Sequence, residues 1–321
     1  MFQAELPQIK GINLRKMRDF VVTPDHGENQ RLDLFLSEKL DGWSRAQVQR
    51  LISEGRALVD GVRRRSSYKL KANDRIEVDD TLPTAGVLVP ESIPLSVIHE
   101  DEYMIAVDKF SGMVVHPGAG RQTSTLANAL LFHYPEIEGL GPKEKPGIVH
   151  RLDKETSGVI LVARTKMAYQ ELQRQFKARE VEKVYIGLVW GKMPQEEGKI
   201  TWAIGRHTRH GERMSVKTNK PRIAETRYTV TKPLGKFTLL EIRPITGRTH
   251  QIRVHLAASG HPIVGDSRYG RKKGTSGCPR LFLHAHHLTV THPFSGERVS
   301  FHSPLPSDLT KFLEKISTHA L

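Results

Sequence analysis

The amino-acid sequence predicts an α+β fold, in which a domain with a mixed or mainly antiparallel sheet follows a small N-terminal domain. Apolar runs typical of strands outnumber helical patterns, and the two do not alternate strictly, which argues against a doubly wound parallel sheet. The stretch "DDTLPTAGVLVPESIP" (79–94), with three prolines and little periodicity, divides the chain into two regions. A length of 321 residues leaves room for two or three domains.

We expect four segments along the chain. A leader without clear periodicity, expected to be disordered, spans 1–18, and a small domain spans 19–80. A linker over 81–94 then leads to the larger domain, 95–321. No internal repeat or low-complexity segment interrupts either domain.

Two helices and several short strands are expected in the small domain. Apolar residues at helical spacing predict helices over 31–40 and 45–55, with Ser44 as the N-cap of the second. Turn signals at Asp60-Gly61 and Asn73-Asp74 separate apolar runs that predict strands. The result is a compact unit of two helices followed by strands.

Strands outnumber helices in the larger domain. The periodicity predicts helices over 124–134, 166–180 and 249–260. Two short strands joined at Ser111-Gly112 are expected within 103–118, and single strands over 158–164, 182–191, 224–230, 237–245 and 281–293.

The charge of the chain indicates the class of its partners. Lys and Arg number 49 against 35 Asp and Glu, a net charge of +14 that favours a polyanion such as RNA. No apolar run approaches the roughly 18 residues that span a membrane, and the N-terminus has no secretory apolar segment. Cys278 is the single cysteine, which excludes intramolecular disulfides and fits a reducing compartment. A cytoplasmic protein without membrane contact is therefore expected.

A basic cluster marks the small domain. Between Arg45 and Arg75 there are nine Lys or Arg against three acidic residues. Such a cluster can neutralise phosphates, although a charge run is also compatible with a merely solvated face. The segment "SRAQVQRLISEGRALVDGVRRRSSYKLKANDRIEV" resembles the αL-type RNA-binding domain of a small-subunit ribosomal protein, which implies RNA binding. The candidate RNA-binding side chains are those of Arg45, Arg50, Arg63, Arg64, Arg65 and Lys69.

Asp153 is the candidate nucleophile. It follows Arg151 by two residues and stands just before a Thr-Ser-Gly turn and an apolar strand. A carboxylate between a cation and a buried strand can be held ionised yet poorly hydrated, as a nucleophile requires. An N-cap or turn-forming role remains an alternative at this stage.

Three separated segments resemble one enzyme family. "HRLDKETSG" (150–158), "EKVYIGLVWG" (182–191) and "GRTHQIRVHLAASGHPIVGDSRYG" (247–270) are similar to the signatures of the RluA family of pseudouridine synthases. With the small domain, the resemblance covers about residues 20–315 and is strongest to the D-type members. It implies that uridines of large-subunit ribosomal RNA are isomerised to pseudouridine, without a cofactor.

The resemblance also implies roles for individual residues. Asp153 would be the catalytic aspartate, attacking either the ribose C1′ or the uracil ring. Tyr185 would stack on the uracil and serve as a base, and Arg253 would pair with Asp153. Arg151 would fill the space left by the flipped uridine. Without the resemblance, Tyr185 fits a sheet or core position equally well, and Arg253 fits a phosphate contact.

Some features and alternatives stay open at this stage. The segment "DKFSG" departs from the family's usual Asn-Lys-Pro-x-Gly, with Asp108 for Asn and Phe110 for Pro, which leaves the shape of that loop uncertain. The basic stretch 205–222 is interpreted as a surface loop or hairpin that grips RNA, or as a solvated insertion.

Other functions besides pseudouridine synthesis in ribosomal RNA are compatible with parts of the sequence. A synthase acting on tRNA and a non-catalytic ribosome assembly factor remain alternatives. A metal-dependent nuclease is disfavoured because no acidic cluster suits magnesium. The spacing of the histidines does not suit zinc, so neither a metal nor a nucleotide cofactor is expected. Nothing in the sequence requires more than a monomer, with ribosomal RNA of the large subunit or a pre-ribosomal particle as its partner.

Overall fold

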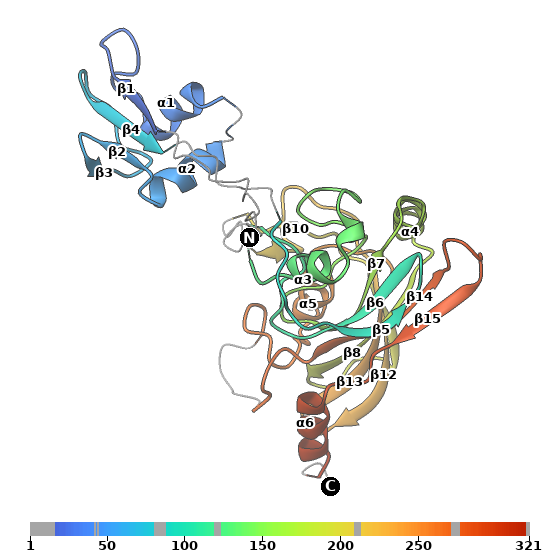
Figure 1. Cartoon of the computed structure of the whole chain (residues 1–321). Coiled ribbons are helices and arrows are strands. Elements are labelled where there is room, and N and C mark those ends of the chain that lie inside the picture. The colour runs from blue at the N-terminus through green and yellow to red at the C-terminus, as the bar shows by residue number, and fades with distance from the viewer. Residues whose placement is uncertain are drawn as a thin grey trace, which may run out of the picture. The chain divides into compact units, whose positions relative to one another are not determined.

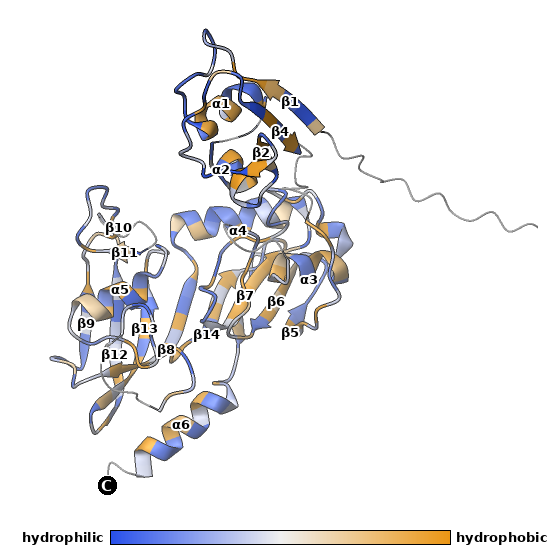
Figure 2. Cartoon of the chain, turned by 90° about the vertical axis from the view of Figure 1, so that its left-hand side faces the viewer, coloured by the Kyte–Doolittle hydropathy of each residue, from blue (hydrophilic) through white to orange (hydrophobic). Residues whose placement is uncertain are grey.

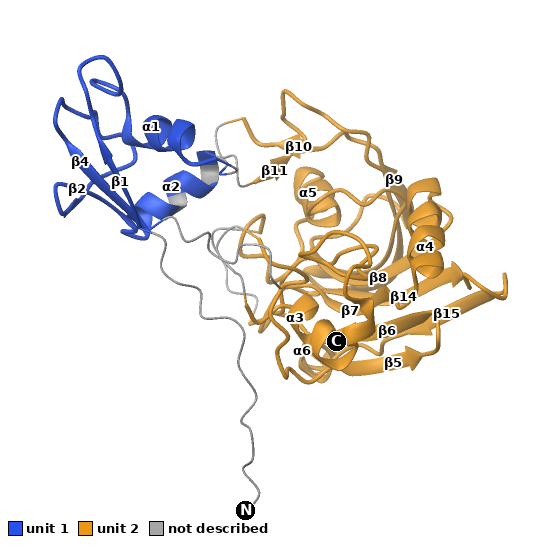
Figure 3. Cartoon of the chain, turned by 45° about the horizontal axis from the view of Figure 1, so that its top comes forward, with its two compact units in different colours: residues 1–85 blue, residues 86–321 orange. Residues whose placement is uncertain are grey.

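The computed structural model describes residues 17–41, 43, 45–79, 88–118, 123–208, 213–270 and 277–318, and the side chains of Ala46 and Arg50 lie outside the described set. The chain forms two compact units, residues 1–85 and residues 86–321 (Figure 3). Each unit has its own hydrophobic core and is described by itself.

The N-terminal unit packs two helices on a four-stranded antiparallel sheet. The sheet has the order β1-β4-β2-β3, with β1 Met17–Val21, β2 Ala57–Val59, β3 Val62–Arg63 and β4 Arg75–Asp79. The helices α1 (Leu32–Lys39) and α2 (Arg45–Ser53) follow the predicted apolar spacing and bury Leu36 and Leu51 in one core. Asp60, Gly61 and Asn73 adopt the positive φ angles that their turns require.

The start of this unit differs from the sequence prediction. Met17 and Arg18, assigned to a leader, belong to β1, which pairs along its whole length with β4. The sequence does not predict this strand, because its exposed and half-buried residues alternate and form no apolar run. The rest of the expected leader, and Ser44, lie outside the described residues.

A buried carboxylate joins the two helices of this unit. The Asp33 side chain is fully buried, and its oxygens accept hydrogen bonds from Arg31 Nε at 2.9 Å and Gln49 Nε2 at 2.7 Å. Arg45 Nη2 lies 3.4 Å from the same carboxylate. The hydrogen bond from Arg31 is the largest of the effects that lower the pKa of Asp33 to about 2.

We expect Asp33→Asn to destabilise the N-terminal unit by about 1 to 2 kcal/mol at pH 7, less than the full pKa shift because solvent screens the exposed arginines. The folded-state pKa lies below the unfolded one, so this stabilisation is present above about pH 4 and is lost as the pH falls through about 2. Urea unfolding of α1 and α2 by NMR, at pH 7 and below pH 3, measures both values. Asp41→Asn, at an exposed position, is the control, and an equal loss at both pH values contradicts the prediction.

One large sheet organises the second unit (Figure 1). Its nine strands have the order β5-β6-β7-β14-β8-β13-β12-β9, and β15 pairs with β14. The parallel pair β14–β7 is the exception among antiparallel neighbours, so the predicted α+β class with a mainly antiparallel sheet is confirmed. The strands are β5 Ser96–Glu100, β6 Met104–Lys109, β7 Ser157–Ala163, β8 Glu182–Trp190, β9 Glu197–Ile200, β12 Thr226–Leu234, β13 Phe237–Pro244, β14 Leu283–Thr291 and β15 Arg298–His302. A short hairpin, β10 Gly205–Arg206 with β11 Met214–Ser215, stands apart from this sheet.

Helices cover both faces of the strands that carry the site. In β7, Ile160 and Val162 share a core with α3 (Leu126–His133), whereas Leu161 shares a core with α4 (Lys166–Ala178). Burial on both faces explains why β7 is a continuous apolar run, and β6 and β7 are largely hydrophobic in Figure 2. On the other half of the sheet, α5 (Gln251–Ala258) and α6 (Ser307–Thr318) pack with β8 and β13.

Three segments differ from the sequence prediction. The second strand expected after Ser111-Gly112 is absent from the described residues of that segment, where Val114 makes only an isolated bridge to Thr125. The end of the expected linker belongs to the second unit, because Leu88 is buried in its core and Val89 O accepts a hydrogen bond from Asn128. The C-terminal helix α6 was not predicted, although Leu309 and Phe312 show helical spacing. No helix in the described part of the chain is long and apolar enough to cross a membrane.

Gly158 brings the Asp153 loop against the middle of the sheet. Its φ is +112°, and it pairs with Ala285 at the parallel step between β7 and β14. A Cβ at this position would collide with the Ala285 backbone, so the strands approach each other here only because residue 158 is glycine. The loop that precedes Gly158 therefore ends beside β14 and β8.

Candidate active site

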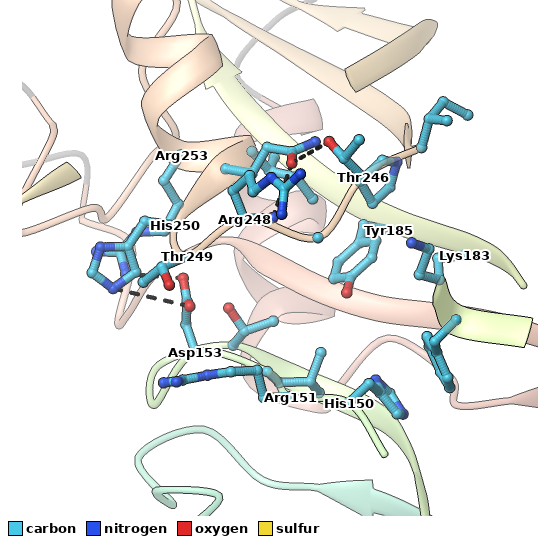
Figure 4. A pocket seen from close by; sticks show the side chains of 18 of the residues that line it. His150, Arg151, Asp153, Lys183, Tyr185, Thr246, Arg248, Thr249, His250 and Arg253 are labelled. Carbon is cyan, nitrogen blue, oxygen red and sulfur yellow. Dashed lines mark hydrogen bonds and ion pairs between the residues drawn. The ribbon is translucent and has the colours of Figure 1, made fainter. Parts of the chain in front are cut away.

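A cavity of about 490 Å³ opens where three segments of the second unit meet (Figure 4). The segments are the loop before β7, the end of α4 with the start of β8, and the end of β13 with the start of α5. Asp153, Tyr185 and Arg253, which lie up to 100 residues apart in sequence, all line it.

Hydrogen bonds to backbone carbonyl groups hold the Asp153 loop in place. Lys109 is 1% exposed, and its Nζ donates to the carbonyl oxygens of Phe110, Met113 and Lys154 at 2.9 to 3.2 Å. Gly112 N–H donates to the Lys154 carbonyl at 2.8 Å. These bonds determine the shape of the "DKFSG" loop despite its departure from the usual motif, and Phe110, in the place of proline, is 55% exposed. Burial lowers the pKa of Lys109 to about 7, while the charge of Asp153 opposes that shift.

Arg253 connects Asp153 to a second carboxylate. Its Nη1 lies 3.3 Å from Asp153 Oδ2, whereas its Nε and Nη2 donate to the two oxygens of Asp266 at 2.8 and 2.9 Å. Burial disfavours the Arg253 charge, but the hydrogen bond and charge of Asp266, together with the charge of Asp153, raise its pKa above the usual value. The resemblance implied a pair between Arg253 and Asp153. In the structure, the Asp266 carboxylate accepts two hydrogen bonds from the guanidinium, and Asp153 contacts the remaining nitrogen, Nη1.

Tyr185 faces the same cavity from β8. The strand pairs Tyr185 with Ile242 of β13 and Ala285 of β14, so its backbone is held on both sides. Burial, and then the negative charge of Asp153, raise the pKa of Tyr185 well above its usual value. The phenol is therefore protonated at neutral pH, and Figure 4 shows its ring turned into the cavity.

Cations surround the cavity. Arg151 is exposed, and Figure 4 shows its side chain beside Asp153. Lys177, Arg179, Lys183 and Arg248 also line the cavity. Burial, and then the charge of Arg179, lower the pKa of Lys183 to about 8. The neighbouring His150 belongs to the scaffold, because it stacks on Phe176 and accepts a hydrogen bond from Leu161 N–H at 2.8 Å.

Two residues that the sequence analysis did not select organise the loop before α5. Gln251 Oε1 accepts hydrogen bonds from Thr246 Oγ1 at 2.6 Å and Arg248 N–H at 3.0 Å, which folds the loop. His250 has a φ of +54°, and its Nε2 lies 3.9 Å from Asp153 Oδ1. The run of polar residues at the start of an otherwise apolar helix was the signal that could have identified both.

Two further histidines, His255 and His284, have structural partners. His255 is fully buried between Thr226 Oγ1 and the Trp202 carbonyl. His284 bonds Ser157 and the Ser303 carbonyl. Across the described ranges, no group of three or more His, Cys, Asp or Glu side chains is suitably arranged to hold a metal ion.

A second hollow, of about 800 Å³, adjoins the cavity. The two share Gly247, Arg248 and Thr249 as lining residues. Apart from Ile204, the rest of the lining comes from the 205–222 stretch, which contains β10 and β11 and carries Lys220 and Arg222. The predicted surface hairpin therefore presents basic side chains beside the candidate active site.

The predicted RNA-binding residues of the small domain lie in the N-terminal unit. Arg63, Arg64, Arg65 and Lys69 are exposed, and the Arg64 guanidinium lies 4.9 Å from the centre of the Tyr68 ring. Arg45 is exposed, and its Nη2 lies 3.4 Å from Asp33 Oδ2. The side chain of Arg50 lies outside the described set.

Comparison with known proteins identifies both units. Residues 103–258 match the RNA pseudouridylate synthase family, and residues 30–76 match the S4 domain. An RNA pseudouridine synthase of Chloroflexus aurantiacus is 43% identical over 300 residues, which cover 94% of each chain. The ribosomal large subunit pseudouridine synthase D of Nitrosomonas europaea is 40% identical, over 92% of this chain and 87% of that protein.

A solved structure shares the fold of the second unit. Human RNA pseudouridylate synthase domain containing 1 matches with a TM-score of 0.56 and 29% identity, over 70% of this chain and 96% of that one. The motifs, the fold and relatives that are 40 and 43% identical over most of the chain agree with one another. The chain therefore belongs to the RluA family of RNA pseudouridine synthases and carries an RNA-binding S4 domain before its catalytic domain.

Proposed function

We propose that the enzyme isomerises uridines of large-subunit ribosomal RNA, with Asp153 as the nucleophile. The observation that carries the proposal is the position of Asp153, whose Oδ2 lies 3.3 Å from Arg253 in the cavity that Tyr185 also lines. The names of relatives such as the pseudouridine synthase D of Nitrosomonas europaea favour ribosomal RNA as the substrate.

The target uridine must first leave its helix. A stacked base cannot enter a cavity of about 490 Å³, so the nucleotide has to rotate out of the stack, at a cost of a few kcal/mol. The exposed guanidinium of Arg151, next to Asp153, is suited to fill the vacated space and to contact phosphate. The cations at the cavity rim offset the charge of the flipped nucleotide.

The chemistry then requires one carboxylate and no external reactant. Attack of the Asp153 oxygen on ribose C1′ forms a C–O bond as the C1′–N1 bond breaks, and the uracil leaves with the bonding pair. The uracil rotates, its C5 attacks C1′, and the carboxylate departs. Loss of the C5 proton and protonation of N1 then complete pseudouridine, so the number of protons is unchanged overall. Attack by Asp153 on the uracil ring is the alternative first step.

The neighbouring side chains fit these steps. Arg253 contacts Asp153 and restricts its orientation, because Asp266 holds the guanidinium by two hydrogen bonds. Tyr185 offers a flat ring against which the detached uracil can stack while it rotates. Its pKa is raised, so the phenol acts as a base only if the RNA complex lowers that value. We propose that a monomer is sufficient, because Asp153, Tyr185 and Arg253 already meet in the cavity of a single chain.

Mapping of pseudouridine in total RNA tests the target. A strain that lacks the gene is expected to lose specific pseudouridines from large-subunit ribosomal RNA, and the wild-type gene restores them. Loss from tRNA alone would contradict the proposed substrate but not the family activity. Unchanged RNA in both pools would favour a non-catalytic assembly role.

Removal of the basic side chains that line the hollow beside the cavity is expected to weaken RNA binding. We expect the double change Lys220→Ala and Arg222→Ala to weaken RNA affinity about 3- to 30-fold at physiological salt and to reduce the salt slope by about 1 to 2. The single-turnover rate at saturating RNA should stay within about 2-fold, because neither side chain lines the Asp153 cavity. Filter binding across a salt series measures both effects.

The matched control removes the same charge elsewhere. Lys232→Ala with Lys311→Ala changes two exposed lysines that line none of the described cavities. Equal losses of affinity in the two double variants would mean that net charge, and not the hollow, attracts the RNA.

A further inference from the structure

His250 lies between Asp153 and a buried part of the fold. Its Nε2 is 3.9 Å from Asp153 Oδ1, and its Nδ1 is 2.8 Å from Tyr269 Oη. The two rings meet edge to face, with centroids 5.5 Å apart. Figure 4 shows the imidazole turned toward the carboxylate, on the opposite oxygen from the one that Arg253 contacts.

The hydrogen bonds of Tyr269 determine which nitrogen of His250 carries the proton. The backbone N–H of Met214, in β11, donates to Tyr269 Oη at 3.0 Å. The phenol has a single hydrogen, and in the described part of the chain its recorded hydrogen-bond acceptor is His250 Nδ1. In the arrangement that satisfies all three groups, Nδ1 accepts and the neutral ring carries its proton on Nε2, facing Asp153.

The backbone of His250 is held in a disfavoured conformation to keep the ring there. Its φ of +54° lies in the left-handed region, which residues other than glycine rarely adopt. The carbonyl of His250 accepts the first bond of α5 from Val254 N–H, and Gln251 fixes the preceding loop. Strain of this kind is retained where the surrounding structure requires it, which is common at functional sites.

Burial favours the neutral form of the His250 ring, and the surrounding charges act in both directions. Burial is the largest influence and lowers the pKa of His250, and Arg253 and Arg268 act in the same direction. Asp153 and Asp266 oppose them. A neutral N–H can orient a carboxylate without adding a second full positive charge, which would weaken the carboxylate as a nucleophile.

We propose that His250, oriented by Tyr269, is a positioning residue that holds Asp153 Oδ1 while Arg253 holds Oδ2. The inference rests on the proposed role of Asp153 as the nucleophile. At 3.9 Å the distance from His250 Nε2 to Asp153 Oδ1 is longer than a hydrogen bond. We expect it to shorten to a hydrogen bond when RNA enters the cavity, as active-site contacts often do. A carboxylate held at both oxygens cannot turn away from the ribose, so fewer encounters with the substrate are unproductive.

A double-mutant cycle tests the connection from Tyr269 through His250. We expect His250→Ala to lower the single-turnover rate at saturating RNA about 10- to 100-fold, and Tyr269→Phe to lower it about 10-fold, with RNA affinity within about 2-fold. The double variant should react no more slowly than His250→Ala, because Tyr269 acts through the imidazole. His250→Gln, whose amide nitrogen can approach the place of Nε2, should recover part of the rate.

Two results would overturn the proposal. Multiplicative losses in the double variant would show that Tyr269 acts independently of His250, and unchanged rates in the single variants would show that neither positions Asp153. Tyr134→Phe is the matched control, since it removes a hydrogen bond to Glu100 from a tyrosine that does not line the cavity. Thermal unfolding of each variant identifies any loss that is merely structural.

A spectroscopic readout remains available if a variant loses stability. In the wild-type protein, ¹⁵N NMR of labelled histidines should show His250 as the Nε2–H tautomer, with the resonance assigned from His250→Gln. A ring protonated on Nδ1 would overturn the proposal, whatever the rates. Both readouts use whichever RNA the enzyme modifies, so a wrong choice of ribosomal target leaves this test intact.

Discussion

Asp153→Asn is expected to abolish pseudouridine formation, with a fall in rate of at least about 10⁴-fold. The amide has nearly the same size but lacks the charge and the nucleophilic oxygen pair that attack requires. The S4 domain and the basic hairpin are unchanged, so RNA affinity and its salt dependence should remain within about 2-fold. Tritium release or pseudouridine mapping on the modified RNA measures the rate, and filter binding measures the affinity.

Glu155→Gln is the matched control for this change. Glu155 stands two residues from Asp153, and its Oε2 lies 3.5 Å from the same Arg253, but its side chain does not line the cavity. We expect less than a 10-fold change in rate. Retention of activity in Asp153→Asn, or an equal loss in Glu155→Gln, would contradict the assignment of the nucleophile.

Arg253→Met is expected to lose both activity and stability. Asp266 is fully buried, and removal of its partner leaves an uncompensated buried carboxylate, at a cost of about 3 to 5 kcal/mol. Asp153 loses its cationic contact in the same step. Urea unfolding and the single-turnover rate measure the two losses.

A second change separates the two roles of Arg253. Asp266→Asn in the Arg253→Met background neutralises the buried charge, while its oxygen can still accept from the backbone N–H groups of Arg268 and Tyr269. We expect most of the stability to return and the rate to stay at least about 100-fold below wild type. Recovery of activity together with stability would mean that Arg253 serves the fold alone.

The two groups of positioning contacts approach Asp153 from different directions. Arg253 reaches Oδ2 from within α5, and His250 faces Oδ1 from the N-terminus of the same helix. Lys109 holds the backbone of the Asp153 loop through a hydrogen bond to the Lys154 carbonyl. These contacts restrict the Asp153 carboxylate through a guanidinium, an imidazole N–H and the loop backbone.

Much of the fold could be predicted from local patterns. The helices α1, α2, α4 and α5 follow apolar spacing, and β7 and β8 are apolar runs long enough to recognise. The elements that were missed depend on distant partners: β1 has no apolar run and exists because β4 pairs with it. The run after Gly112 has the composition of a strand, but the 109–113 loop bonds instead to the Asp153 loop.

By itself, the sequence determined the residue types of the site and the family to which they point, because the chemistry requires those groups in short, recognisable motifs. Only the tertiary structure decided how the groups act on one another. Asp266, which follows Arg253 by 13 residues in the sequence, accepts hydrogen bonds from its guanidinium. Met214 in the hairpin donates a hydrogen bond to Tyr269, whose phenol is in turn hydrogen-bonded to His250. The reason is physical: the strength of a hydrogen bond or ion pair depends on distance and burial, and only the folded chain determines both.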